Sequence, residues 1–170
     1  MKERDRLVGV RNEVIMKHKL LVAVDGTKNS FKTALYAAQA CDGSETSGVR
    51  IVVFHVLPRL PPHVEGSKAA AADKRAEKFD GKAWDKAEQT LAQIKERIVR
   101  AGVKPECVMT ENADEEGDVV AQIIQAAAAH GCDTIVVGRH EKSIFGRFLA
   151  GSVGEHLLHK TVGYAIWLVE

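Results

Sequence analysis

Five short apolar segments alternate along this chain with longer segments in which apolar residues recur every three or four positions. A continuous apolar run predicts a strand buried on both faces, and the wider spacing predicts a helix with one buried face. Strands and helices in alternation form a parallel sheet with helices on both faces, because right-handed crossovers are strongly preferred. The predicted fold class is therefore α/β, a single-domain, Rossmann-like open sheet of five parallel strands.

The first two expected strands stop at residues that break a strand. The apolar run 20–24 ends at Asp25-Gly26, and the run 51–57 ends at Pro58. The other expected strands are 106–110, which an acidic loop at 111–117 follows, 134–137 and 164–169.

Four helices are expected between these strands. Asn29 or Ser30 is expected to cap the first and Asp118 the third, while Ser152 starts the fourth and Gly131 ends the third. The apolar faces are formed by Phe31, Ala34, Leu35 and Ala38 in the first helix, by Trp84, Ala87, Leu91, Ile94 and Ile98 in the second (82–101), and by Val120, Ile123, Ile124 and Ala127 in the third.

A length of 170 residues favours one domain. Residues 1–17 precede the first strand and form an N-terminal extension to a domain of residues 18–170. Leu7, Val10 and Val14 are spaced for a helix, so the extension is expected to be an amphipathic arm that docks; a disordered tail is the alternative.

Composition limits the classes of partner. With 24 basic and 23 acidic side chains the net charge is only +1, so non-specific binding to nucleic acid or membranes is not expected. No apolar run approaches the roughly 18 residues of a transmembrane helix, and the start of the chain is charged, so a soluble cytoplasmic protein without membrane insertion is expected. The three cysteines have no CxxC spacing, which favours reduced thiols.

The loop after the fourth expected strand carries the strongest functional signal. Gly138 follows an apolar run, and nine residues separate Glu141 from Gly151-Ser152 at a probable helix start. A strand that breaks at glycine and reaches a helix N-terminus through Gly-Ser forms an anion site in α/β folds, where ligands bind beyond the carboxyl ends of the strands. The loop therefore predicts a phosphate cradle, although its glycines would also suit simple tight turns.

Glu141 opposes this prediction. At an effective dielectric constant near 20, like charges about 4 Å apart repel by roughly 4 kcal/mol, enough to weaken binding about a thousandfold. Arg139, Lys142 and Arg147 would offset that repulsion if their charged groups reach the site. Alternatively, Glu141 points to solvent or accepts a ribose hydroxyl.

Three segments resemble the universal stress protein family, and the similarity spans roughly residues 18–169. They are Val-Ala-Val-Asp-Gly-Thr at 22–27, His55-Val56 at the end of the second strand, and the loop from Gly138 to Val153. ATP-binding members carry G-x-x-G, nine residues, and then Gly-Ser or Gly-Thr. This chain matches the first glycine, the spacing and the final pair. It departs from the family at two places: Glu141 replaces the second glycine, and residues 162–164 are Val-Gly-Tyr where members often carry a proline.

The resemblance implies an adenine nucleotide alpha hydrolase-like fold that binds ATP, with Mg²⁺ as its companion, or AMP. It also implies a homodimer paired through residues 164–169, and a regulatory role in the stress response with an unidentified protein partner. The alternative is a dimeric interaction module that has lost ATP binding because of Glu141. By the same resemblance, the nucleotide site comprises Asp25 and the backbone of Val56 around adenine, Gly138 near ribose or phosphate, Gly151, Ser152 and Val153 near phosphate, and Arg139 and Glu141 within the loop.

Catalytic and metal-binding patterns are weak. No Ser-His-Asp, Cys-His or paired-carboxylate arrangement stands out, so at most slow ATP hydrolysis is expected. Asp25 would also serve as a turn residue bonded to the backbone of Thr27 or Lys28. His156 and His159 lie three apart on a helix without a clear third ligand, so no metal site is predicted. His55 and His130 are expected to be structural.

Overall fold

The computed structural model describes residues 18–40, 49–58, 69–138 and 153–170, with the backbone alone for 69–80. Strands and helices alternate, as the hydrophobic pattern predicts. The strands are β1 (Lys19–Val24), β2 (Arg50–Leu57), β3 (Val108–Asp114), β4 (Thr134–Gly138) and β5 (Ala165–Val169). The helices are α1 (Lys28–Ala40), α2 (Ala69–Arg100), α3 (Val119–Ala129) and α4 (Val153–Lys160), with a 3-10 turn, η2 (Pro105–Cys107), before β3.

The strands form one five-stranded parallel sheet in the order β3-β2-β1-β4-β5. Val22 of β1 lies opposite Val53 of β2 on one side and opposite Val136 of β4 on the other. From β1 the chain passes through α1 to β2, and it later returns to β4 on the far side of β1. The strand order therefore reverses between β1 and β4, and the predicted α/β class is confirmed.

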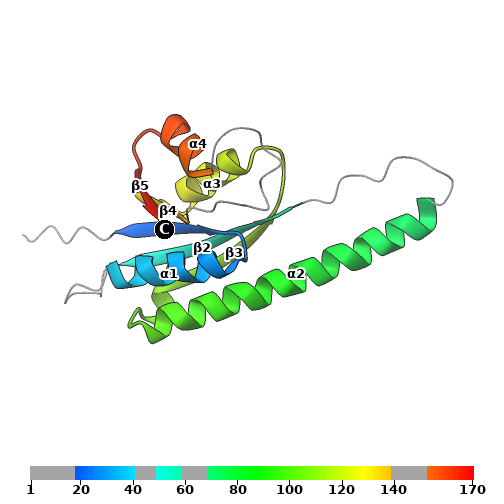
Figure 1. Ribbon diagram of the computed structural model, residues 1–170, viewed down its shortest axis with the longest axis horizontal. Helices are drawn as coiled ribbons and strands as arrows, with labels where there is room; N and C mark the ends of the chain where they lie inside the picture. Colours follow the sequence, from blue (N-terminus) through cyan, green and yellow to red (C-terminus); the bar gives the residue numbers. More distant parts are fainter. Residues whose placement is uncertain (1–17, 41–48, 59–68, 139–152) are drawn as a thin grey trace, which may run out of the picture.

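Helices cover both faces of this sheet, with α1 and α2 on one face and α3 and α4 on the other (Figure 1). Alternate residues of a strand point to opposite faces. Leu20 and Val22 accordingly pack with α1 and α2, while Leu21 packs with α3 and α4, and all three are 0% exposed. This double burial is the physical reason that β1 is a continuous apolar run rather than an alternating one.

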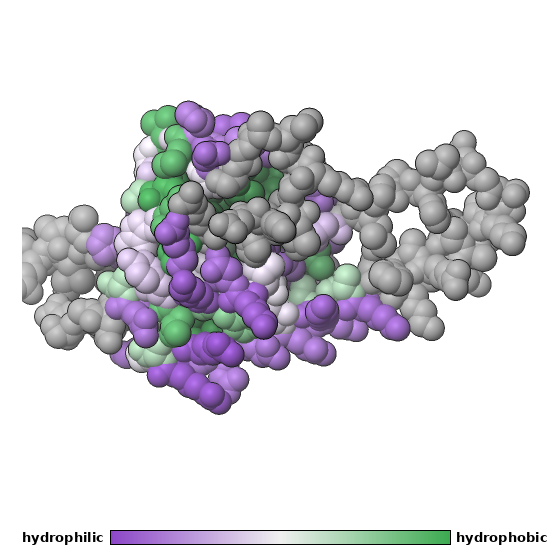
Figure 2. Space-filling model, viewed as in Figure 1, coloured by the Kyte–Doolittle hydropathy of each residue, from purple (hydrophilic) through white to green (hydrophobic). Residues whose placement is uncertain are grey.

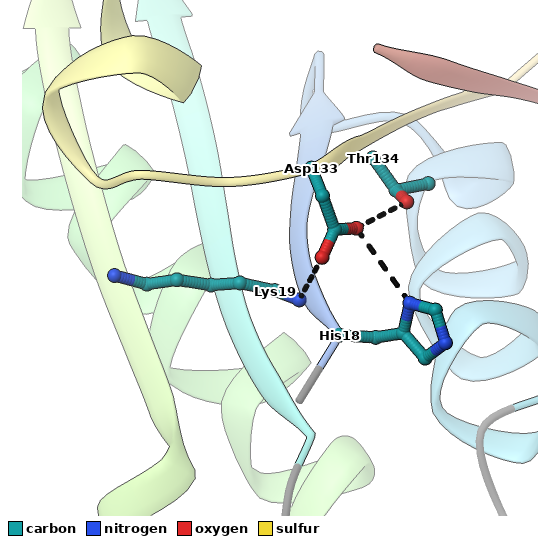
Figure 3. A network of polar contacts seen from close by, with 4 residues as sticks. All are labelled: His18, Lys19, Asp133 and Thr134. Carbon is teal, nitrogen blue, oxygen red and sulfur yellow. Dashed lines mark hydrogen bonds and ion pairs between the residues drawn. The ribbon is translucent and has the colours of Figure 1, made fainter. Parts of the chain in front are cut away.

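A carboxylate joins the amino ends of β1 and β4 (Figure 3). Asp133 Oδ2 accepts a hydrogen bond from the backbone N–H of Lys19 at 3.0 Å, and its Oδ1 accepts one from Thr134 Oγ1 at 2.6 Å. His18 Nδ1 lies 3.8 Å from the same Oδ1. Backbone bonds from Asp133 to Lys19 and from Ala165 to Asp133 continue the link to β5. The amino edge is thus fixed by polar contacts, far from the edge where the predicted site lies.

Helix α3 begins and ends where its sequence predicts. Asp118 is the N-cap, and its side chain accepts a hydrogen bond from Val120 N at 3.0 Å. Lys160 of α4 donates to the other carboxylate oxygen at 2.5 Å, and this bond is the main reason that the pKa of Asp118 is lowered. At the other end Gly131 has a φ of 62°, a conformation that glycine adopts without strain.

Helix α1 corrects two expectations. It begins at Lys28, so neither Asn29 nor Ser30 is its N-cap. The side chain of Asp25 binds Thr27 N and Ser30 Oγ, which organises the first turn earlier than expected. The buried face is also shifted, because Phe31 and Leu35 are only half-buried. The buried residues are Ser30, Thr33, Ala34, Ala37 and Ala38.

Strand β3 begins two residues after the predicted start at residue 106, because residues 105–107 form the 3-10 turn η2, and it extends further than predicted at its other end. It reaches Asp114, which pairs with Leu57, so the first four residues of the expected acidic loop belong to the strand. Strand β2 offers backbone partners up to Leu57, and β3 lies at the edge of the sheet, where side chains such as Met109 face solvent. An edge strand tolerates polar residues because half of its surface stays hydrated, and its charges discourage pairing with another chain.

Helix α2 begins at Ala69, well before the expected start at residue 82. Its amino-terminal part extends past the sheet (Figure 1). Gly81 lies within it with nothing within 4 Å of an added Cβ, so the glycine lowers helix propensity without breaking the helix. The expected stripe is buried from Ala87 onward, whereas Trp84 is half-buried. In the described part of the chain no helix, α2 included, is long and apolar enough to cross a membrane.

Candidate functional site

The first component of the candidate site is the turn that joins β1 to α1. Asp25 Oδ1 accepts hydrogen bonds from Thr27 N at 3.0 Å, Thr27 Oγ1 at 2.6 Å and Ser30 Oγ at 2.7 Å. Ser30 Oγ in turn accepts from the backbone N–H of Asp25 at 3.0 Å. The alternative drawn from the sequence, a turn residue bonded to the backbone of Thr27, is therefore confirmed. Three donors also stabilise the ionised carboxylate, which reduces the repulsion it would exert on a nearby anion.

The second component is Gly138, the last residue of β4. Its φ lies outside the left-handed region, so a tight turn is not the reason for glycine at this position. A Cβ added there would lie 2.6 Å from Thr33 Oγ1 and 2.9 Å from Asn29 Nδ2. Glycine is therefore required by the close approach of α1 to β4, as it is where helix and strand pack tightly in dinucleotide-binding folds.

Asn29 and Thr33 were missed as neighbours of the predicted site. Thr33 is 0% exposed, and its hydroxyl donates to the carbonyl of Asn29 at 2.9 Å. The sequence feature that could have indicated them is a pair of small polar residues, Ser30 and Thr33, three positions apart on the inward face of an otherwise apolar helix. The Asp25 turn and Gly138 therefore both lie against the first turns of α1.

The third component is His55, next to the end of β2. The residue is 7% exposed, and its Nδ1 lies 3.2 Å from Asn112 Oδ1 on β3. Desolvation by burial is the largest influence on this ring and lowers the pKa of His55 below 6.5, while the Asn112 bond and the charge of Asp25 act in the opposite direction. On its other side the ring approaches the Asp25 turn, because a Cβ added to Gly26 would lie 3.9 Å from Nε2.

The side chain of Val56 is less well placed than that of His55 to contact a ligand. It is 2% exposed and packs in the core beneath α3 and α4, together with Leu21 and Phe54. Only its backbone is left for the contact with adenine that the resemblance implies. Val153, at the start of α4, likewise packs against this core. The structure therefore does not direct either valine side chain toward the Asp25 turn.

Four of the predicted site residues lie outside the described residues: Arg139, Glu141, Gly151 and Ser152. The described part of the chain contains no group of three His, Cys, Asp or Glu side chains able to hold a metal ion. His159 is exposed and His156 is half-buried on the short helix α4. The described site thus consists of three strand ends, with hydroxyl, amide, carboxylate and imidazole groups suited to hydrogen bonding.

The sequence matches the family model described as the universal stress protein family over residues 16–162. A comparison with curated protein sequences found no match. Similar solved structures include a universal stress protein in complex with cAMP, which is 20% identical, with 90% of this chain and 97% of that chain covered and a TM-score of 0.61. Universal stress protein UspA from Lactobacillus plantarum is 17% identical, with 91% and 98% covered and a TM-score of 0.65.

A third similar structure is the universal stress protein from Archaeoglobus fulgidus in complex with dAMP. It is 16% identical, with 90% of this chain and 98% of that chain covered and a TM-score of 0.54. At these identities the structural likeness bears on the fold, and it agrees with the parallel sheet described above.

Proposed function

Because this chain belongs to the universal stress protein family, we propose that it is a regulatory domain of the stress response that binds an adenine nucleotide, ATP with Mg²⁺ or AMP. Two solved relatives hold cAMP and dAMP, which supports an adenine nucleotide as the ligand class. The proposed site is the carboxyl edge of the sheet where the strand order reverses, between β1 and β4.

The observation that carries this proposal is that the Asp25 turn and Gly138 both lie against the first turns of α1, at the carboxyl ends of β1 and β4. A helix N-terminus presents unpaired N–H groups and a partial positive charge, and both favour a phosphate, which the proposal places at the start of α4, beside Val153. Asp25 Oδ1 already accepts three hydrogen bonds from Thr27 and Ser30, so its charge is partly offset. In the proposal, Asp25 and the backbone of Val56 lie around adenine, Gly138 near ribose or phosphate, and Arg139, Glu141, Gly151, Ser152 and Val153 line the phosphate loop.

The site offers little support for catalysis. Asp25 and His55 are the titratable residues at the ends of β1 and β2. The Oδ1 atom of Asp25 is occupied by three donors, and the His55 ring is buried and bonded to Asn112. Activation of a water molecule needs a base with room to accept its proton. We therefore propose that any ATP hydrolysis is slow.

A second candidate function is a dimeric interaction module that has lost ATP binding. The specific observation in its favour is Glu141 in place of the second glycine of the phosphate loop. Repulsion of roughly 4 kcal/mol at about 4 Å would weaken ATP binding about a thousandfold. Such a module would act on an unidentified protein partner through its surfaces.

In either case we propose a homodimer paired through β5. This edge strand carries no charged side chain, whereas β3 at the opposite edge carries Glu111 and Asp114. An uncharged edge strand offers unpaired backbone groups to a second copy, and charges on the other edge oppose such pairing. Exposed apolar residues gather on the side where α4 and β5 lie (Figure 2). They are Leu158, Val162 and Leu168.

Calorimetric titration of nucleotide-stripped protein with ATP and Mg²⁺, and separately with AMP, tests the proposed function. The matched variant is Glu141→Gly, which restores the family pattern. Micromolar binding by the natural protein supports the nucleotide-binding domain. Absence of binding in the natural protein, together with binding in the variant, supports the interaction module instead. Absence of binding in both contradicts an adenine nucleotide as the ligand of this protein.

A further inference from the structure

The His55 ring lies between the turn after β1 and the edge strand β3. In the sheet its neighbours in register are Val24 and Asn112. Nδ1 is 3.2 Å from Asn112 Oδ1, and Nε2 is the ring atom nearest to a Cβ placed on Gly26, at 3.9 Å. The two ring nitrogens therefore face different surroundings, an amide oxygen on one side and the carboxyl edge of β1 on the other.

These surroundings determine which nitrogen carries the proton. An amide oxygen only accepts, so the 3.2 Å contact requires a hydrogen on Nδ1. Burial keeps the ring neutral at pH 7 by lowering the pKa of His55, and in a neutral imidazole the second nitrogen is then an acceptor. Among the described residues, the charged group that acts on this ring is Asp25, whose Oδ1 is engaged with Thr27 and Ser30.

We propose that His55 Nε2 accepts a hydrogen bond from an N–H or O–H group of the bound nucleotide, and that Asn112 is the positioning residue that holds this tautomer. The inference rests on the proposed adenine-nucleotide function and names a residue that selects the ligand. An adenine nucleotide has two kinds of donor, the exocyclic amino group and the ribose hydroxyls. A 6-keto purine presents an acceptor at the position of the amino group, so it would face the Nε2 lone pair unfavourably.

Calorimetric titrations with AMP, inosine monophosphate, 2′-deoxy-AMP and 3′-deoxy-AMP distinguish the two donors. The titrations compare the natural protein with His55→Phe and with the control Thr110→Val. Thr110 is an exposed residue on β3, the strand that carries Asn112. Each of the three analogues lacks one hydrogen-bond donor of AMP. In the natural protein and the control, the analogue that lacks the donor bound by Nε2 should bind roughly three- to tenfold more weakly than AMP. In His55→Phe that difference should vanish. Weaker binding of inosine monophosphate identifies the amino group as the donor, and weaker binding of a deoxy analogue identifies a ribose hydroxyl.

Nitrogen-15 NMR of the histidine rings tests the tautomer without any nucleotide. The expected spectrum has a protonated Nδ1 and an unprotonated Nε2 for His55 at pH 7.5. The Asn112→Leu variant keeps the imidazole, should populate the other tautomer, and should lose the discrimination between AMP and the weak analogue. It serves the same purpose if His55→Phe does not fold.

The outcomes separate this inference from the function it rests on. A proton on Nε2 in the natural protein overturns the acceptor role, whatever the nucleotide affinity. Equal discrimination in the natural protein and in His55→Phe also overturns it while leaving adenine-nucleotide binding intact. Absence of any nucleotide binding by the natural protein refutes the proposed function and the acceptor role together.

Discussion

Replacement of Gly138 by alanine tests whether the close approach of α1 to β4 requires a glycine. The added Cβ would lie 2.6 Å from Thr33 Oγ1, whereas ordinary contact begins at 3.4 Å, so the two elements must separate by about 0.8 Å. Thr33 is 0% exposed, and rotation of its side chain would break its 2.9 Å bond to the carbonyl of Asn29. Asn29 Nδ2, at 2.9 Å, ends a more flexible side chain and can move aside.

The expected loss of unfolding free energy is about 2–4 kcal/mol, because overpacking of a filled site costs about 1–3 kcal/mol and a lost hydrogen bond adds about 1 kcal/mol. Urea unfolding followed by the fluorescence of Trp84 and Trp167 measures it. The double variant Thr33→Ala, Gly138→Ala removes the clashing oxygen and should be more stable than the sum of the single changes predicts.

Gly81→Ala is the matched control for this experiment. Gly81 lies within α2 with nothing within 4 Å of an added Cβ, so the same chemical change should stabilise the protein by roughly 0.5–1 kcal/mol. The reasoning about α1 and β4 is refuted if Gly138→Ala unfolds at the same urea concentration as the natural protein, or if Thr33→Ala gives no compensation.

Three further predictions concern pH, a helix cap and assembly. Because burial lowers the pKa of His55 below 6.5, the unfolded chain takes up a proton first, so stability should fall as the pH drops below about 6.5; a pH series of urea midpoints should show this slope, and His55→Gln should lack it. Asp118→Ala should lower the unfolding free energy by about 1 kcal/mol through the lost cap of α3, measured by urea unfolding at pH 7. Since the folded pKa of Asp118 is lowered, its stabilisation should persist above pH 3.8 and disappear on acidification; if stability falls in acid by the same amount in the variant as in the natural protein, this reasoning is wrong. Leu168→Lys, a charge on the exposed face of β5, should convert the proposed dimer to monomers in light scattering, whereas Met109→Lys on the other edge strand should not; dimers in both variants exclude β5 as the interface.

Local signals accounted for most of the element positions. Asp118 caps α3, and Gly131 ends it, because a capping carboxylate and a left-handed glycine act on the residues next to them in sequence. The limits of β3 could not be predicted in the same way. Glu111 and Asp114 have low strand propensity, and they extend the strand because β2 continues beside them up to Leu57.

The candidate site was only partly visible in the sequence. Asp25 and Gly138 were identified through their places at strand ends and through the family motif, and the turn role of Asp25 through its neighbours. Asn29 and Thr33 were not, since contact with Gly138 depends on which strand lies next to β1. A hydrophobic pattern records the period of an element, but it does not record what packs against it.

The sequence by itself determined the α/β class, the alternation of strands and helices, and membership in the universal stress protein family. Continuous apolar runs and helical spacing are properties of neighbouring residues, so they can be recognised without a fold. Only the tertiary structure decided that the strand order reverses between β1 and β4, and that α1 packs so closely on Gly138 that no side chain fits there. It also decided that Asn112 fixes His55 from the neighbouring strand. Those arrangements depend on residues that are distant along the chain and come into contact only when the sheet has formed.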